Sequence, residues 1–182
     1  MKPRVYLAGK IRKNDWRHRL VPGLREQLWN DGPIDLGEFK YVGPFFVSCD
    51  HGCNHQPSSH GATGGYAFDE STFTRADVIK NNMAALRDAD LIFAYITTPD
   101  CFGTLVELGW SLHARKRVVI AYAPGMPVDD FWYLSGQVTK VYFDVNELRL
   151  QKLLNHEIRK FNQHKQLTKR KYQTLLEFVG NL

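Results

Sequence analysis

The chain has 182 residues, of which 43% are hydrophobic and 24% are charged, and its formal net charge is +5 at pH 7. This length suits one domain with a substantial core and is too short for two ordinary domains. The composition is typical of a soluble globular protein, and no apolar run approaches the length of a membrane span. Three cysteines, an odd number, do not form a disulfide framework. The amino terminus leads directly into a strand-like pattern, so we expect no signal peptide and a cytoplasmic protein.

The positive charge lies in the last part of the chain. From residue 151 onward there are two acids, Glu157 and Glu177, and seven basic residues, so this segment accounts for the whole net charge of +5. The basic residues are Lys152, Arg159, Lys160, Lys165, Lys169, Arg170 and Lys171. We expect residues 146–182 to be a basic helical segment of the same domain. A solvated helix face is the simpler interpretation, and nucleic acid is not the expected partner, because the segment lacks aromatic residues at a stacking spacing.

Residues 4–8 predict the first strand, and the loop after it begins with Gly9. Glycine permits a tight turn and the close approach of a ligand. Lys10 and Arg12 then place positive charge at the carboxyl end of the strand, where a phosphate could bind. An ordinary basic surface loop is the alternative interpretation.

The next residues predict a helix, a break and a second strand. Apolar residues recur every four positions over 16–30, which indicates a helix that Asp15 could cap. Glycine and proline in residues 30–39 break this pattern. Residues 41–47 predict the second strand, and Gly43–Pro44 within it favours an edge position.

Residues 48–75 have no periodicity and predict a long loop over the substrate. Side chains of metal-ligand type gather in its first part: Cys49, Cys53, His55 and His60. Their arrangement is not a standard zinc pattern, so the sequence leaves open whether this loop binds a metal or covers the substrate.

The centre of the chain predicts a helix over 74–89, a buried strand over 91–96, a helix from Thr104 to about Arg115 and a strand over 118–123. A strand, a helix and a strand within about thirty residues form one βαβ unit of a parallel sheet. Ligands bind such sheets beyond the carboxyl ends of the strands, which is where residues 97–103 should lie.

Two carboxylates of this region suit glycosidic-bond chemistry. Glu107 falls in the first turn of the predicted helix, where the helix dipole favours an ionised carboxylate that can attack an electrophilic carbon. Asp100 supplies a second carboxylate, and Gly103 lets the backbone approach a ligand. Acids are common in first helical turns for structural reasons alone, so position by itself does not assign the function.

The motif Asp-x-x-Gly-Thr-x-x-Glu-x-Gly is present at residues 100–109 as DCFGTLVELG, between ADLIFAYI and KRVVIAYA. Together with VYLAGKI near the amino terminus, it resembles the signature of the nucleoside 2-deoxyribosyltransferase family, which includes nucleotide N-glycoside hydrolases. The resemblance implies that Glu107 is the nucleophile, that Tyr6 orients it and that Asp100 contacts the base. Where the family often carries a further base-handling aspartate this chain has Asn82, which cannot release a proton at useful pH. Gly103 and Thr104 belong to the same expected substrate loop.

After residue 123 the sequence predicts a short aromatic helix around residues 131–134, a strand over 141–143 and two helices over 145–161 and 167–178. The apolar face of the first of these two helices is expected to contain Leu148, Leu153, Ile158 and Phe161. In the resembled family, residues after the fourth strand complete the site of an adjacent protomer. Ser135 is the candidate for that role here, and a homo-oligomer is the corresponding expectation.

The expected fold is a single α/β domain over residues 1–182, with a flavodoxin-like parallel sheet of about five strands and helices on both faces. The expected function is cleavage of the N-glycosidic bond of a nucleoside or nucleoside 5′-monophosphate through a covalent glycosyl-Glu107 intermediate. The sugar passes to another base or to water, without a cofactor and without a membrane. The alternative is a nucleotide-binding sensor protein that does not turn over.

Overall fold

The computed structural model describes residues 2–12, 15–24, 32–45 and 75–179, with side chains of the last segment described over 76–168. Within these residues one sheet has six strands in the order β2-β3-β1-β4-β5-β6. The strands are β1 Arg4–Ala8, β2 Ile34–Asp35, β3 Lys40–Gly43, β4 Leu91–Ile96, β5 Arg117–Tyr122 and β6 Lys140–Tyr142. All neighbours pair in parallel except β2, which runs antiparallel to β3. The five parallel strands therefore have the flavodoxin order, as the sequence predicts.

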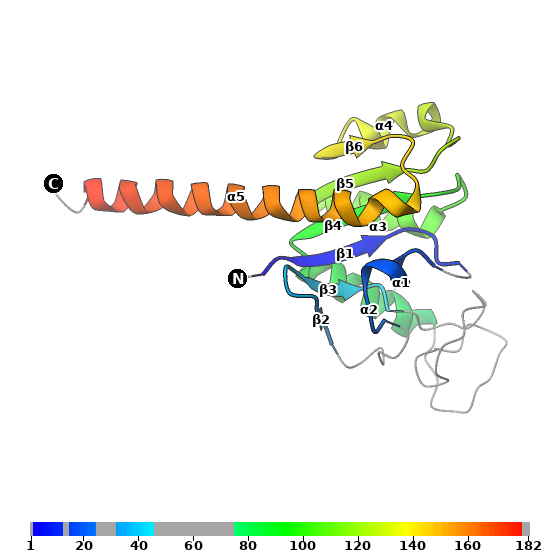
Figure 1. The fold of residues 1–182 in the computed structure, drawn as a ribbon, viewed down its shortest axis with the longest axis horizontal. Helices are drawn as coiled ribbons and strands as arrows, with labels where there is room; N and C mark the ends of the chain where they lie inside the picture. The colour runs from blue at the N-terminus through cyan, green and yellow to red at the C-terminus, as the bar shows by residue number, and fades with distance from the viewer. Residues whose placement is uncertain (1, 13–14, 25–31, 46–74, 180–182) are drawn as a thin grey trace.

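The helices cover both faces of the sheet (Figure 1). They are α1 Arg17–Leu20, α2 Arg75–Asp88, α3 Phe102–His113, the 3-10 helix η2 Val128–Phe131, α4 Trp132–Ser135 and α5 Glu147–Val179. Helices α1 and α5 lie on one face, and α2 and α3 lie on the other. No helix in the described part of the chain combines the length and the apolar character that crossing a bilayer requires.

Alternation along β1 divides the core into two layers. Val5 and Leu7 point to the layer under α1 and α5, whereas Tyr6 and Ala8 point to the layer under α2 and α3. All six residues of β4 are buried, as expected for a central strand covered on both faces. Tyr6 therefore faces the same layer as α3, the helix that carries Glu107.

The strands over 4–8 and 91–96 have the predicted bounds, and the strand predicted over 118–123 runs one residue earlier. The sequence missed β2, because a two-residue strand is too short to show alternation. Pairing with β2 makes β3 an inner strand, so the predicted edge position is wrong. Gly43–Pro44 is tolerated because β3 ends at Gly43, and Pro44 therefore has no ladder hydrogen bond to lose.

The helix predicted over 16–30 is wrong in its length, because α1 ends at Leu20. Pro22 and Gly23 follow in a turn, and both residue types break helices. Leu24 is nevertheless buried, as the apolar spacing predicts. Residues 25–31 and most of the loop predicted over 48–75, including its four metal-ligand candidates, lie outside the described residues.

The two helices predicted over 145–161 and 167–178 form one continuous helix, α5. The segment between them, residues 162–166, contains neither glycine nor proline, so nothing in it interrupts a helix. The predicted apolar face is wrong at Leu148, which is 80% exposed. Among the described side chains of α5, those that are fully buried are Leu150, Leu154, Glu157 and Ile158.

Glu157 fastens α5 to the edge of the sheet. Its carboxylate is buried and accepts hydrogen bonds from Arg117 of β5 at 2.8 Å and from Tyr142 of β6 at 2.6 Å. A buried carboxylate with two such partners is satisfied in the folded state. The amino-terminal half of α5 is therefore fixed across the sheet, whereas the rest of the helix extends beyond it (Figure 1).

Candidate active site

A cavity of about 370 Å³ opens at the carboxyl ends of β1 and β4. These two strands are the topological switch point of the sheet, where open α/β folds bind ligands. The cavity is lined by Gly9, Lys10, Ile11, Pro44, Asn82, Asp100, Cys101, Phe102, Gly103, Thr104 and Glu107. Seven of the predicted site residues are in this set, brought together from the loops after β1 and β4, from α2 and from the start of α3.

Tyr6 of β1 donates a hydrogen bond to Oε1 of Glu107, with 2.5 Å between the two oxygens. Tyr6 is fully buried, and burial, followed by the adjacent Glu107 carboxylate, raises its pKa well above the usual value of 10.0. The phenol therefore keeps its proton and acts as a donor at neutral pH. This contact fixes the position of one carboxylate oxygen at the edge of the cavity.

Glu107 has a raised pKa, because burial penalises its charged form. The hydrogen bond from Tyr6 and the positive charge of Arg17 oppose this shift. The predicted place of Glu107 in the first helical turn is wrong, since α3 begins at Phe102 and Glu107 falls in the second turn. The helix dipole acts mainly on the first turn, so the tyrosine and the arginine, rather than the dipole, favour the ionised form.

Asp100 has the opposite shift within the same cavity. Nζ of Lys10 lies 2.5 Å from its Oδ2, and this hydrogen bond is the main reason that the pKa of Asp100 is lowered. The pair crosses the cavity mouth from the loop after β1 to the loop after β4. Both side chains are partly exposed, so solvent screens the pair and it remains open to competition from a ligand.

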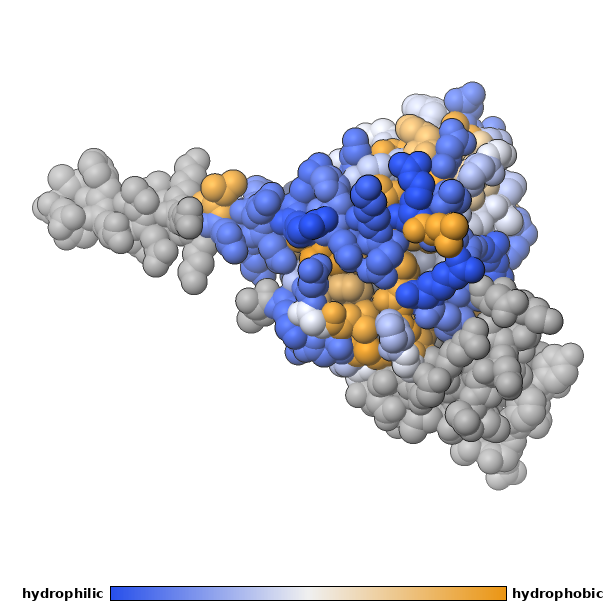
Figure 2. All heavy atoms as spheres, in the orientation of Figure 1, coloured by the Kyte–Doolittle hydropathy of each residue, from blue (hydrophilic) through white to orange (hydrophobic). Residues whose placement is uncertain are grey.

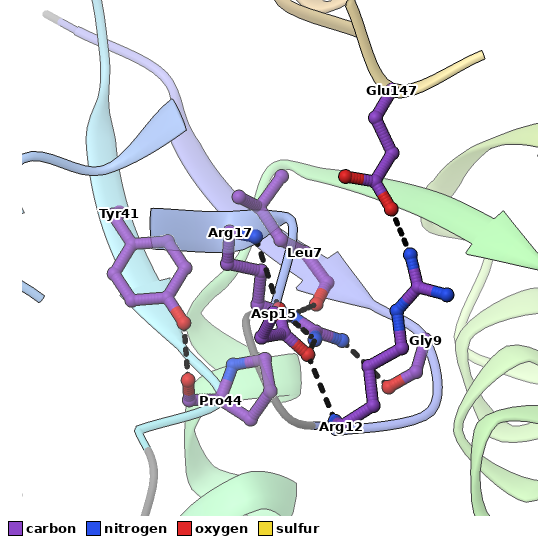
Figure 3. Close-up of polar contacts among 8 residues, drawn as sticks. All are labelled: Leu7, Gly9, Arg12, Asp15, Arg17, Tyr41, Pro44 and Glu147. Atoms are coloured by element: carbon purple, nitrogen blue, oxygen red, sulfur yellow. Dashed lines mark hydrogen bonds and ion pairs between the residues drawn. The ribbon is translucent and has the colours of Figure 1, made fainter. Parts of the chain in front are cut away.

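Arg17 holds the loop after β1 in place, and sequence reasoning missed it. Its Nε donates to the carbonyl of Leu7 at 2.7 Å and its Nη2 to that of Gly9 at 2.6 Å (Figure 3). Its Nη1 contacts both carboxylate oxygens of Asp15 at 2.9 Å, and both side chains are fully buried. A single arginine near a helix start gives no periodic signal, so nothing in the sequence marks this contact.

Gly9 is required by the same loop. Its φ of +149° is rarely adopted by other residues, and a Cβ there would lie 2.7 Å from the carbonyl oxygen of Tyr95. The loop after β1 therefore passes directly over the end of β4, which brings Lys10 to Asp100.

Three predicted site residues lie outside the cavity lining: Tyr6, which reaches the site through its hydrogen bond to Glu107, and also Arg12 and Ser135. Arg12 forms an ion pair with Glu147 at the start of α5, and Figure 3 shows its guanidinium directed there. Ser135 lies on α4 with its hydroxyl 2.8 Å from that of Tyr122. Of the two predicted phosphate-binding cations, only Lys10 therefore belongs to the cavity in this chain.

Among the residues that the structure describes, no group of three or more histidine, cysteine or acidic side chains is placed to hold a metal ion. No protein-family model matches the chain, and no curated protein matches it. What the arrangement offers chemically is a carboxylate fixed by a phenol at a cavity edge, with an ion pair and an amide beside it. Such a carboxylate can act as a nucleophile on a ligand in the cavity.

Proposed function

We propose that this protein cleaves the N-glycosidic bond of a nucleoside or nucleoside 5′-monophosphate, as an enzyme of cytoplasmic nucleotide metabolism that needs no cofactor. The observation that carries the proposal is the 2.5 Å hydrogen bond from Tyr6 to Glu107 at the edge of the cavity. A nucleophilic carboxylate has to be held in one orientation and kept ionised, and this contact supports both requirements. The motif over residues 100–109 supports the same reading.

In the first step a carboxylate oxygen of Glu107 attacks the anomeric carbon of the sugar. The bond between that carbon and the base nitrogen breaks, and its electron pair leaves with the base. Tyr6 occupies Oε1, which leaves Oε2 for the attack. A second base or a water molecule then attacks the same carbon and releases Glu107, so two inversions give net retention of configuration.

Asp100 acts in this scheme as an anion and not as a proton donor. Its lowered pKa beside Lys10 keeps it ionised at neutral pH. An ionised carboxylate accepts hydrogen bonds from the base or the sugar and stabilises positive charge that develops on the ring. The departing base takes its proton from water, and the amide of Asn82, which also lines the cavity, contacts its edge.

Lys10 supports a 5′-phosphate on the substrate, because it is a cation of the cavity lining and its ion-pair partner among the described residues is a partly exposed carboxylate. A phosphate can replace Asp100 as that partner and form a charge-assisted hydrogen bond. Asn82, in the place of a base-handling acid, weakens the case for transfer to a second base. Both features favour hydrolysis of a nucleotide over transfer between nucleosides.

A homo-oligomer belongs to the same proposal. Phe102 lines the cavity but is 72% exposed, and Val106 on the next turn of α3 is 69% exposed. Trp132 and Tyr133 of α4 are exposed to a similar extent, at 71% and 68%. Large apolar side chains that continue outward from a cavity suit a surface covered by a second copy. Light scattering should therefore give a mass above that of one 21.0 kDa chain.

The direct test is a screen of nucleosides and their monophosphates for released base, with and without an acceptor base. Mass spectrometry of quenched reactions should find a glycosyl adduct, and fragmentation between residues 100 and 107 should assign it to Glu107. An adduct on Asp100 would reverse the two carboxylate roles. Binding in calorimetry without any released base would instead identify a nucleotide sensor.

A further inference from the structure

The outer face of α5 carries one sign of charge. Arg149, Lys152, Arg159 and Lys160 are all exposed and recur three, seven and one positions apart, which places them on one side of the helix, opposite the residues that pack on the sheet. We call these four residues the basic face. Figure 2, which views the molecule from the side of α5, shows hydrophilic residues along most of the described part of this helix.

Among the described side chains of α5, no acid forms an ion pair with the basic face. The described side chains of this helix include two carboxylates, and both are used elsewhere: Glu147 pairs with Arg12, and Glu157 is buried against Arg117. Within the described part of the chain, no residue of the basic face forms a salt bridge. Like charges three or four residues apart on a helix destabilise it by about 0.2–0.5 kcal/mol per pair. An ordinary solvated helix face mixes charges of both signs, and this one does not.

The same helix continues beyond the described elements that pack against its amino-terminal half. Figure 1 shows α5 running past the sheet, and its sequence there adds Lys169, Arg170 and Lys171. From Phe161 to Val179 this is about 27 Å of helix at 1.5 Å per residue. Most of the stability of a helix in a protein comes from tertiary packing rather than from intrinsic propensity, and this stretch runs past the sheet on which it could pack. A binding partner on this stretch would therefore stabilise it.

The charge and the shape of the basic face narrow the kinds of partner that could bind it. A second copy of the chain would set this face against like charge. A membrane surface requires a continuous apolar helix face turned outward. The apolar face of the amino-terminal half of α5 is packed on the sheet, and the exposed large apolar side chains in the described part of the helix are two isolated leucines, Leu148 and Leu167. Single strands are bound by stacking on aromatic side chains, and the basic face has none. The major groove of B-form DNA admits a helix, whereas that of A-form RNA is too narrow.

We propose that the basic face of α5 and the helix beyond it bind the phosphate backbone of double-stranded DNA without reading its sequence. This inference is independent of the proposed catalytic function, because none of the four residues lines the cavity. It also revises the expectation from the sequence, which does not show that Glu147 and Glu157 form ion pairs with Arg12 and Arg117 rather than with the basic face.

The test uses the full chain and a labelled 24-base-pair duplex in fluorescence anisotropy across a salt titration. If the protein contacts four phosphates or more, log affinity should fall with log salt concentration with a slope of about −3.6 or steeper. The variant Lys152→Gln, Arg159→Gln, Lys160→Gln should flatten this slope by about 2.7, at 0.9 per lost contact. Its affinity at low salt should fall by at least tenfold.

A matched control removes the same charge from other surfaces, with Lys80→Gln and Arg87→Gln on α2 and Lys140→Gln on β6. All three are exposed, and their loss should leave the salt slope within experimental error. Equal weakening by the two triple variants would reduce the effect to net charge and overturn the proposal. So would equal affinity for a single strand or an RNA duplex, tighter binding to phosphatidylserine vesicles than to DNA, or no binding by the wild type at 50 mM salt. Since the substituted residues are exposed, thermal melts should show both variants folded.

Discussion

Lys10 and Asp100, ninety residues apart in the chain, form an ion pair at the mouth of the cavity. Each lies on a loop at the carboxyl end of a central strand, and the strands β1 and β4 are neighbours in the sheet. The pair places opposite charges at the entrance of the cavity. Deeper in the site, the hydrogen bond from Tyr6 and the positive charge of Arg17 favour the ionised form of Glu107. The pKa of Asp100 is therefore lowered and that of Glu107 is raised, which fits separate roles for the two carboxylates of the cavity.

Glu107→Gln should keep the fold and lose at least 1,000-fold in kcat, taken as roughly the scale on which loss of a nucleophile acts. Because burial raises the pKa of Glu107, the folded state binds its proton more tightly than the unfolded state does. The ionised form therefore lowers stability as pH rises, and the neutral glutamine should be equally or more stable at pH 7. Urea unfolding and turnover measure the two effects.

Glu38→Gln, at an exposed site outside the cavity, is the control for this variant. An activity of Glu107→Gln above a tenth of that of the wild type would show that Glu107 is not the nucleophile.

Tyr6→Phe should move the acid limb of the pH profile of kcat/KM to higher pH. In the proposed mechanism activity requires ionised Glu107, so it should fall as pH drops through the pKa of that residue, which already lies above the usual 4.5. The hydrogen bond from Tyr6 lowers this pKa, so when it is lost the effect of burial raises the pKa of Glu107 further. At neutral pH kcat/KM should fall about 10- to 100-fold, the equivalent of a charged hydrogen bond of about 1.5–3 kcal/mol.

Tyr95→Phe is the matched control for that experiment. Tyr95 is also a buried tyrosine, and its hydroxyl donates to the carbonyl of Val145 at 2.9 Å, away from Glu107. Its loss should lower stability without moving the acid limb. A limb that stays in place in Tyr6→Phe would mean that the phenol does not control the ionisation of the nucleophile.

Lys10→Met should lower the ratio of kcat/KM for a nucleoside monophosphate over that for its parent nucleoside by about tenfold, since a charged hydrogen bond to phosphate is lost. Arg12→Met is the comparison, because Arg12 pairs with Glu147 and does not line the cavity. We expect that variant to leave the ratio within a factor of three. A wild-type ratio of one would contradict the phosphate site altogether.

Arg17→Met should destabilise the protein by about 3–5 kcal/mol, because it leaves the buried carboxylate of Asp15 without its partner. It also leaves the carbonyls of Leu7 and Gly9 without their donor. Lys2→Met breaks a pair of similar distance, 2.7 Å to Asp35, whose side chains are about half exposed. That control should change the free energy of unfolding in urea by less than about 1 kcal/mol. Similar losses in both variants would show that Arg17 does not organise the loop.

The parts of the fold that the sequence predicts correctly are those with strong local patterns. The apolar run over 91–96 and the strand over 4–8 needed no knowledge of distant residues. By contrast, Ile34–Asp35 becomes a strand only through its pairing with β3, and a two-residue element has no pattern of its own. The end of α1 at Leu20 depends on Pro22 and Gly23, which outweigh the apolar spacing that continues to Leu24.

The candidate site divides in the same way. Glu107, Asp100 and Gly103 stand in one motif, so their common location follows from local spacing. Local spacing does not show which cation lines the cavity, because Lys10 and Arg12 are only two residues apart. They differ in their ion-pair partners, which are Asp100 for Lys10 and Glu147 for Arg12. Those carboxylates come from distant parts of the chain, and only the folded arrangement selects between the two cations.

The direction of α5 has a practical meaning for experiments. The helix starts beside the loop after β1, at Glu147, and runs back across the sheet to Val179 on the far side of the molecule (Figure 1). The chain around Lys2 also lies away from the cavity, at the amino end of β1. Affinity tags, surface attachment or fluorescent labels fused at either end would thus leave the cavity mouth accessible. Because the amino terminus lies on the side of the sheet from which α5 projects, DNA-binding measurements are best made on the untagged chain.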